Sequence, residues 1–415
     1  MKKTLAAVAV LGAFAGSAFA ADVTLYGRID GGFQYNDNQV KFDGEKVVDD
    51  SSFKMGSGQS TGSRFGIKGT EEISEGFKVG FVLEHGFSFD DGAYGDDDRM
   101  FNREASLQLI SDTYGTLALG RMGSIKSDAG TFGYYAGAVN PFGTGWSNFL
   151  GVGSGLFAGQ DSRWDNMITY KSPTFAGTTL YAQYSMGGNG DDEMTHRADR
   201  YAALGVNFVA GNLNLAAVVD WTDEAYKAQP GYVNAADLDY KDRDDEYTFN
   251  VGGSYDFGVA KAYLAGQYFT GANDVAGMVG VLDDAYDAGT WWTETSVSGD
   301  QGENPGVVHT STDISWGAYA DDFKGYGVAV GADVPAFGGN FLVSLAYTDA
   351  EEQNWNVDAT VYSAGVAYTY PLSKRTNLYA FGVYNNRELE GTIFGDSHKM
   401  EQDQYQFAFG MVHKF

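Results

Sequence analysis

The chain has 415 residues with 55 acidic and 27 basic side chains, giving a formal net charge of −28, and it contains no cysteine. Such an acidic chain is not expected to bind nucleic acid, whose phosphates require basic surface, and a chain without cysteine has neither disulfides nor thiolate metal sites. The 57 glycines, 15% aromatic residues and only 6 prolines favour many β-strands with tight turns.

The first segment is a predicted signal peptide, residues 1–20. Two lysines precede an apolar run over residues 5–14, and Ala18-Phe19-Ala20 has the small-x-small form that signal peptidase cuts. The apolar run is shorter than the about 20 residues that a membrane-spanning helix needs. We therefore expect cleavage during export, which leaves residues 21–415 as one mature domain.

Alternation of apolar and polar residues predicts β-strands along the whole mature chain. In the first strand Val23, Leu25, Ile29 and Phe33 alternate with polar residues, and the segment that ends at Phe415 repeats the pattern. An even number of strands lets an antiparallel sheet close without an exposed edge. Sixteen such segments begin near residues 23, 62, 76, 101, 115, 163, 177, 199, 211, 245, 259, 321, 339, 358, 375 and 403.

The connections between these segments alternate between short turns and long polar loops. This asymmetry is typical of an outer-membrane barrel, with the short turns toward the periplasm. Long outer loops are expected over about residues 36–61, 222–244 and 271–320. We predict an all-β fold, a 16-stranded antiparallel transmembrane β-barrel. A soluble β-sandwich is the alternative, but it would not need one apolar face in every strand.

The third long connection, loop 3, covers about residues 123–162 and differs from the others. Between residues 129 and 160 it has no charged residue and is rich in glycine and aromatics. Its glycines and Pro141 argue against a transmembrane helix. We expect loop 3 to pack inside the barrel.

Short motifs along the chain carry a family resemblance. They are Tyr26-Gly27-Arg28, Ser63-Arg64-Phe65-Gly66, Phe101-Asn102-Arg103, Tyr170-Lys171-Ser172-Pro173 and the ending His413-Lys414-Phe415. In this order they resemble the trimeric, sixteen-stranded Gram-negative general porins, especially the neisserial and β-proteobacterial branch. The resemblance covers nearly all of the mature chain.

The resemblance implies an outer-membrane homotrimer that passes small hydrophilic solutes by passive diffusion. It also implies contacts with outer-membrane lipid and lipopolysaccharide, and with the barrel assembly machinery, for which Phe415 would be the C-terminal assembly signal. We expect no enzyme activity, cofactor or metal, because the 5 histidines are scattered and no catalytic motif occurs. A barrel enzyme and a purely structural or adhesive protein are the other classes, and only long loops favour the latter.

In the porin family, loop 3 narrows the lumen opposite a ladder of basic residues. The matching positions here are Arg28, Arg64, Arg103 and Arg163. Alternation places Arg28, Arg64 and Arg163 on the polar faces of their strands. Arg103 instead shares parity with the apolar face, so its strand is bulged or that wall lies at a subunit contact.

The acidic residues near this ladder leave an alternative open. Each arginine could simply pair with a carboxylate inside the barrel, such as Asp30 or Glu104. The other acidic candidates in the lumen, Asp128 and Asp161, lie near the ends of loop 3. Many family members carry Pro-Glu-Phe-Gly in this loop, and here the glutamate is absent from Asn140-Pro141-Phe142-Gly143. We therefore expect a pore that prefers anions.

A substrate-specific porin for anionic or sugar solutes is the alternative function. The loop 3 aromatics Trp146, Phe149 and Phe157 could form a stacking path for sugars. They could equally anchor the loop against the wall, and we favour anchoring.

Overall fold

The computed structural model describes residues 22–415, apart from residues 96–98, 147–155, 160, 188–198, 224–244, 279–293, 301–304, 312–321, 354–356 and 394–395. The predicted signal peptide lies outside the described residues, as does nearly all of the loop expected at 222–244. In the described part of the chain, no helix has both the length and the apolar character needed to cross a membrane.

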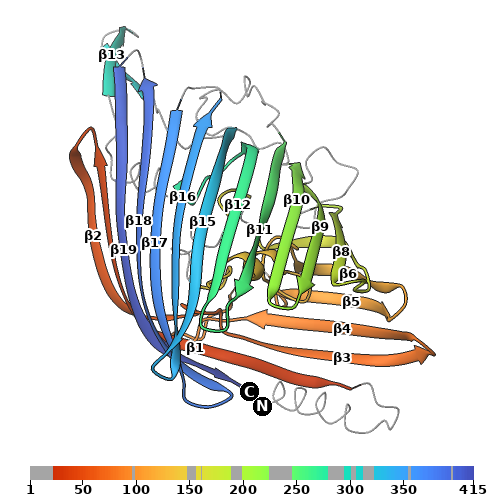
Figure 1. The fold of residues 1–415 in the computed structure, drawn as a ribbon. Coiled ribbons are helices and arrows are strands. Elements are labelled where there is room, and N and C mark those ends of the chain that lie inside the picture. Colours follow the sequence, from red (N-terminus) through yellow and green to blue (C-terminus); the bar gives the residue numbers. More distant parts are fainter. Residues whose placement is uncertain are drawn as a thin grey trace, which may run out of the picture.

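Sixteen antiparallel strands form one closed barrel, as predicted (Figure 1). The first strand, β1, pairs with the last strand, β19, on one side and with β3 on the other, which closes the sheet. The strands of the barrel are β1 (Thr24–Phe42), β3 (Arg64–Ser74), β4 (Phe77–Gly86), β5 (Glu104–Ser111), β6 (Gly115–Gly123), β7 (Arg163–Lys171), β8 (Thr178–Ser185), β9 (Arg200–Ala210), β10 (Leu213–Asp223), β11 (Glu246–Asp256), β12 (Lys261–Ala272), β15 (Phe323–Ala336), β16 (Gly339–Glu352), β17 (Val357–Pro371), β18 (Thr376–Ile393) and β19 (Asp396–Lys414). Their starts lie within a few residues of the predicted ones, except that β19 begins at Asp396 rather than near residue 403.

Strand β2 (Glu45–Ser57) was not predicted and pairs with the outer half of β1. The segment 36–61, expected as a loop, is therefore mostly a β-hairpin, which rises beside β19 in Figure 1. Its turn, Asp43-Gly44, has φ of 48° and 84°, which is the backbone of a type I′ hairpin turn. Asp-Gly is a known hairpin signal, but the polar sequence around it obscured the strand pattern.

Two more strands lie in the segment expected as the outer loop 271–320. They are β13 (Glu294–Asp300) and β14 (Pro305–Ser311), which pair with each other as a separate two-stranded sheet. Strand pairing thus continues beyond the barrel wall in this connection.

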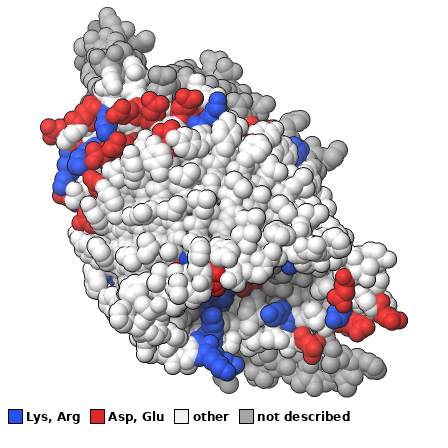
Figure 2. Space-filling model, in the orientation of Figure 1, with Lys and Arg blue, Asp and Glu red and all other residues white. Residues whose placement is uncertain are grey.

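The outward-facing residues of the barrel strands are apolar. Leu107, Leu204, Val251, Leu264 and Phe407 are between 56% and 64% exposed. Figure 2 shows an uncharged band across the strands, with charged residues gathered beyond its two edges. A soluble protein rarely exposes an apolar patch of more than a few hundred Å². This band is what a membrane barrel presents to lipid, so the β-sandwich alternative is wrong.

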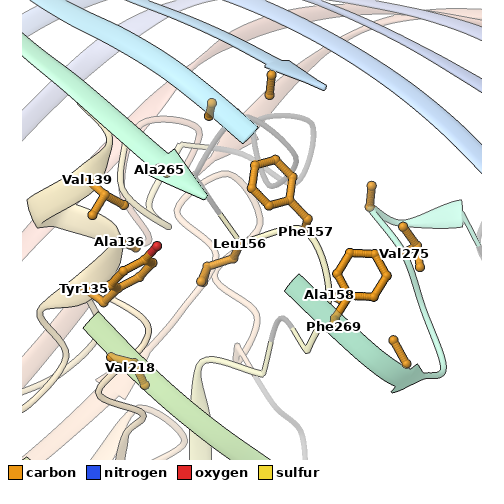
Figure 3. Close-up of a cluster of buried hydrophobic side chains, with 14 of the residues drawn as sticks. Tyr135, Ala136, Val139, Leu156, Phe157, Ala158, Val218, Ala265, Phe269 and Val275 are labelled. Carbon is orange, nitrogen blue, oxygen red and sulfur yellow. The ribbon is translucent and has the colours of Figure 1, made fainter. Parts of the chain in front are cut away.

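The connection between β6 and β7 packs against the inner face of the wall. It contains the short helix α2 (Tyr135–Val139), which contacts β10, β11 and β12. Tyr135 and Phe157 are 0% exposed and belong to a buried cluster with Ala265 and Phe269 of β12 (Figure 3). These contacts hold loop 3 against β10, β11 and β12.

Candidate functional site

All four predicted arginines line one cavity of about 650 Å³ inside the barrel. One side of the cavity is formed by β1, β3, β4 and the residues at the starts of β5 and β7, and the other by residues 128–131 and 144–145 of loop 3. Its charged lining residues are Arg28, Arg64, Lys68, Arg103, Arg163, Glu84, Glu104 and Asp128. Basic side chains therefore outnumber acidic ones around this space.

Arg28 and Arg64 lie side by side because they are register partners on β1 and β3. Both guanidiniums donate hydrogen bonds to the Thr61 hydroxyl, over 3.1 Å from Arg28 and 3.0 Å from Arg64. Arg64 Nε also donates to the Gly62 carbonyl at 2.9 Å. The turn before β3 thus aims both side chains into the cavity.

Asp30 holds this turn in place and is not among the residues that line the cavity. Its carboxylate accepts hydrogen bonds from the backbone N–H groups of Ser60 (2.8 Å) and Thr61 (2.7 Å) and from the Tyr379 hydroxyl (2.6 Å). Asp30 is 0% exposed. The structure therefore places Asp30 beneath the arginines, in contact with backbone donors.

The carboxylate that contacts the arginines is Glu84 on β4. It accepts a hydrogen bond from Arg103 Nε at 2.8 Å and lies 3.6 Å from Arg64 Nη1. The Tyr26 hydroxyl donates to its other oxygen at 3.1 Å. Sequence reasoning named Asp30 and Glu104 as partners and missed Glu84. A signal was present, because Glu84 alternates with apolar Phe81 and Leu83 on its strand.

Arg103 lies outside the strand whose alternation placed it on the apolar face. Strand β5 begins at Glu104, so Arg103 precedes the strand and strand alternation does not apply to it. Its side chain reaches Glu84, and its carbonyl accepts a hydrogen bond from Arg163 Nε at 3.0 Å. Neither a bulge nor a subunit contact is needed to place it.

Arg163 lines the cavity, but the alternation argument that pointed it inward is wrong. Asn166 adopts a left-handed φ of 48°, which interrupts the alternation of β7. Trp164 and Met167 are consequently both buried, although they have opposite parity. Arg163 reaches the cavity because it is the first residue of β7.

The remaining acidic candidates have different roles. Glu104 accepts hydrogen bonds from the Thr131 backbone N–H (2.9 Å) and hydroxyl (2.7 Å), so it ties loop 3 to the wall. Asp128 lines the cavity and is hydrogen bonded to the Thr144 hydroxyl. Asp161 is exposed and is not among the lining residues. No group of histidines and acids in the described ranges is arranged to hold a metal ion.

The aromatic residues of loop 3 pack on the wall. The Trp146 ring centroid lies 5.9 Å from that of Tyr379 and 5.6 Å from that of Phe381. Phe142 and Trp146 are buried together, and Pro141 lies over Gly331 of β15. Gly143 has a φ of 57°, which glycine adopts without strain. Phe149 lies outside the described residues.

Lys126 is a functional residue that sequence reasoning missed. It is 1% exposed and forms an ion pair with Asp220 of β10 at 3.1 Å. Burial lowers the pKa of Lys126, but Asp220, Glu246 and Asp161 outweigh burial and raise it above its usual value. The ammonium group therefore anchors the start of loop 3 to the wall. A single lysine in a glycine-rich loop carries no signal for this role.

The charge balance of the cavity favours anions. Of its three lining acids, Glu104 and Asp128 are hydrogen bonded to loop 3 residues, and Glu84 alone of the three is paired with arginines in the described structure. Guanidiniums in a narrow passage with low-dielectric walls attract anions and orient dipolar solutes.

Known proteins are similar to this chain over almost its whole length. A model of the Gram-negative porin family matches residues 6–389. An outer membrane porin protein of Bordetella pertussis is 36% identical over 405 residues, which is 92% of this chain and 94% of the relative. A monosaccharide porin of Halomonas sp is 25% identical over 383 residues, which is 80% of this chain and 99% of that protein. The solved anion-selective porin from Comamonas acidovorans shares the fold, with a TM-score of 0.63 at 21% identity over 95% of this chain and 100% of that one.

Proposed function

Because this chain belongs to the Gram-negative porin family and is an outer-membrane channel, we propose that it is a general diffusion porin whose narrowest zone prefers anions. The observation that carries the proposal is the cavity in which Arg28, Arg64, Arg103, Arg163 and Lys68 share the lining with three acids. An excess of positive charge in a protein-walled passage raises the local concentration of anions. The anion selectivity of the porin from Comamonas acidovorans, which has the same fold, agrees with this proposal.

Loop 3 is the element that narrows the lumen in this proposal. Two observations support this role: α2 contacts β10, β11 and β12, and loop 3 residues 128–131 border the cavity opposite the arginines. The loop contributes Asp128 to the lining, without the glutamate that many family members carry beside the proline. With Asp128 as its acid in the cavity lining, loop 3 does not neutralise the positive charge of the arginines that it faces.

The reversal potential in a salt gradient across a planar bilayer tests this proposal. The wild-type protein should prefer the anion, and changing Arg64 and Arg163 to Gln together should lower the anion-to-cation permeability ratio severalfold, because two charges leave the ions' path. Arg375→Gln removes an exposed arginine in the turn between β17 and β18 and should leave the ratio unchanged. A clear cation preference of the wild-type protein would contradict the proposal.

A substrate-specific porin is the second candidate function. The similarity to a monosaccharide porin of Halomonas sp favours it. The described aromatics of loop 3 speak against it, since Phe142, Trp146 and Phe157 pack on the wall and do not line the cavity. Saturable block of the current by one solute, with little effect from others of the same size, would support the specific porin.

The assembly that we propose is a homotrimer in contact with lipopolysaccharide, folded by the barrel assembly machinery. The motif resemblance to trimeric porins supports the trimer. Phe415 suits an assembly signal, because its backbone N–H and C=O pair with Gly27 at 3.1 Å and 3.2 Å where β19 closes on β1. Three equal closing steps at high voltage would support the trimer, and single closures would contradict it.

A further inference from the structure

A short segment after β12 enters the barrel and joins loop 3. We call residues 273–278 the strap. Val275 forms an antiparallel bridge with Ala158 of loop 3, and Ala276 N donates a hydrogen bond to the Phe157 carbonyl at 2.8 Å. Val275 and Ala276 are 0% exposed. Figure 3 shows Val275 beside Ala158. We call residues 156–158 the returning limb of loop 3. The strap therefore pairs with the returning limb as one antiparallel strand pairs with another.

The limb is held on its other side by one side chain of β12. Gln267 Oε1 accepts hydrogen bonds from Phe157 N (2.8 Å) and Ala158 N (2.7 Å), and Gln267 Nε2 donates to the Ala158 carbonyl at 3.1 Å. The returning limb thus lies between Gln267 and the strap, with its backbone groups bonded on both sides.

The strap is tied to a distant part of the wall by Arg387 of β18. Arg387 Nε donates to the Ala276 carbonyl at 2.9 Å, and Nη1 donates to the side chains of Gln402 (2.7 Å) and Gln404 (3.1 Å). Arg387 is 6% exposed, although it carries a charge inside the lumen. In the barrel, β15, β16 and β17 separate β12 from β18. Arg387 therefore links the strap, which follows β12, to β18 on the other side of these three strands.

The wall around Arg387 differs in chemistry from the cavity wall. Among its inward-facing side chains, Ser363, Asn385 and Gln402 are buried and neutral, and Asp274 of the strap is the acid that interacts electrostatically with Arg387. A passage opened along this wall would conduct ions without contact with Arg28, Arg64, Arg103 or Arg163. The lumen must therefore be closed along the wall around Arg387 if every solute is to pass through the cavity lined by the four arginines.

We propose that Arg387 is a positioning residue for selectivity. It holds the strap, and through the strap the returning limb of loop 3, so that the lumen is closed on the neutral side and open only beside the basic wall. The size limit and the anion preference of the channel then both depend on Arg387. This inference rests on the function proposed above.

The test is Arg387→Ala in the full chain, with Arg375→Ala as the matched control. Loss of the guanidinium releases the Ala276 carbonyl. We expect a higher single-channel conductance, entry of larger sugars in liposome swelling, and an anion-to-cation permeability ratio shifted toward one. A purely structural role would lower barrel stability and leave the ratio of the folded channels unchanged. Arg375→Ala should behave as the wild-type protein.

A disulfide provides a rescue experiment, since the chain contains no cysteine. Antiparallel partners lie about 4.5–5.5 Å apart at Cα, which is within the range that a disulfide spans. Ala158→Cys with Val275→Cys in the Arg387→Ala background should restore the wild-type size limit when oxidised and lose it when reduced. If Arg387→Ala does not fold, the same cysteine pair is introduced into the protein that retains Arg387. The conductance of this variant before and after oxidation then tests whether the strap is docked on loop 3. Oxidation should then leave the conductance unchanged, and a fall would mean that the strap is undocked in the open channel.

Failure of this inference and failure of the proposed function give different results. A wild-type protein without anion preference contradicts the proposed selectivity. A wild-type protein that prefers anions, with an Arg387→Ala variant of the same conductance, size limit and permeability ratio, overturns the role of Arg387 alone.

Discussion

The carboxylate of Glu84 determines how much of the positive charge of the cavity arginines is neutralised. Arg103 and Arg64 share it, at 2.8 Å and 3.6 Å, and all three side chains are at most 17% exposed. One negative charge between two guanidiniums compensates only half of their charge. The remainder acts on ions that pass, because a narrow protein-walled space screens charges less than open water does.

Glu84→Gln should therefore increase the anion preference. Removing a charge about 4 Å from an ion's path changes its energy by about 1 kcal/mol even in water, which is a roughly fivefold change in occupancy. Reversal potentials in a salt gradient would measure the effect. Glu71→Gln, at the exposed end of β3, is the control and should change little. An unchanged ratio in Glu84→Gln would show that ions do not pass beside this carboxylate.

Asp43 connects the tip of the β1–β2 hairpin to the start of β19. Its Oδ1 accepts a hydrogen bond from Lys399 N at 2.8 Å, and its Oδ2 lies 2.8 Å from His398 Nδ1. The Lys399 N–H contributes most to lowering the pKa of Asp43, followed by the His398 ring, against a small opposing effect of burial. The charged carboxylate is thus favoured in the folded hairpin.

The contact of Asp43 should weaken in acid. A lowered pKa contributes stability above the unfolded value of about 3.9, and that stability is lost as the pH falls through the folded pKa. Asp43→Asn mimics the protonated group and tolerates the left-handed turn. Hydrogen exchange of the Lys399 amide should be slower in the wild-type protein than in Asp43→Asn at pH 7, with the difference vanishing once the pH has fallen through the lowered pKa of Asp43. A difference that persists in acid would rule out the carboxylate charge as its cause.

At the scale of elements, loop 3 fits its wall because inward positions of several strands are glycine. A Cβ on Gly327 of β15 would lie 2.1 Å from the Phe157 ring, and one on Gly331 would lie 2.6 Å from Pro141. A Cβ on Gly252 of β11 would lie 2.8 Å from Val139. The absence of side chains at these positions lets the loop approach the wall closely.

Gly327→Ala should displace the returning limb of loop 3. The new methyl group overlaps a buried ring, and overpacking of this kind costs about 1–3 kcal/mol. We expect altered single-channel conductance with more current noise. Gly266→Ala on β12 is the matched control, because its Cβ would meet only the Val251 carbonyl at 3.9 Å. If both variants conduct alike, the limb does not form part of the pore boundary.

At the scale of the whole molecule, the barrel is organised around the depth of the bilayer. Val251 in the middle of β11 and Phe257 in the turn after it are similarly exposed, 64% and 62%. Their surroundings differ, since Val251 lies in the apolar band and Phe257 lies at the end of the barrel. Exposure alone would not distinguish these two positions.

An arginine at each position should separate the two depths. Val251→Arg should lower the free energy of unfolding by about 2–4 kcal/mol, because a guanidinium at the bilayer midplane loses its hydration, and Phe257→Arg by about 0–1 kcal/mol. Urea titrations of the protein folded in lipid vesicles would measure both. Equal losses would mean that the middle of β11 is not at the midplane.

The strands were predictable because alternation with a period of two is a local property of the chain. The starts of the barrel strands followed from it, except that of β19, and the four arginines of the cavity followed from short motifs that match a family. Prediction failed where local geometry changed without a matching sequence signal. Asn166 interrupts the alternation of β7, and Arg103 lies just before β5.

The sequence by itself determined the barrel and its sixteen strands, and its resemblance to a known family supplied the four arginines that line the cavity. Only the tertiary structure decided which groups meet inside the barrel. Lys126 pairs with Asp220, and Arg387 reaches Ala276, across large separations in the chain. Barrel closure and the path of loop 3 create these contacts, and both depend on packing of distant segments. No local pattern of residues encodes them.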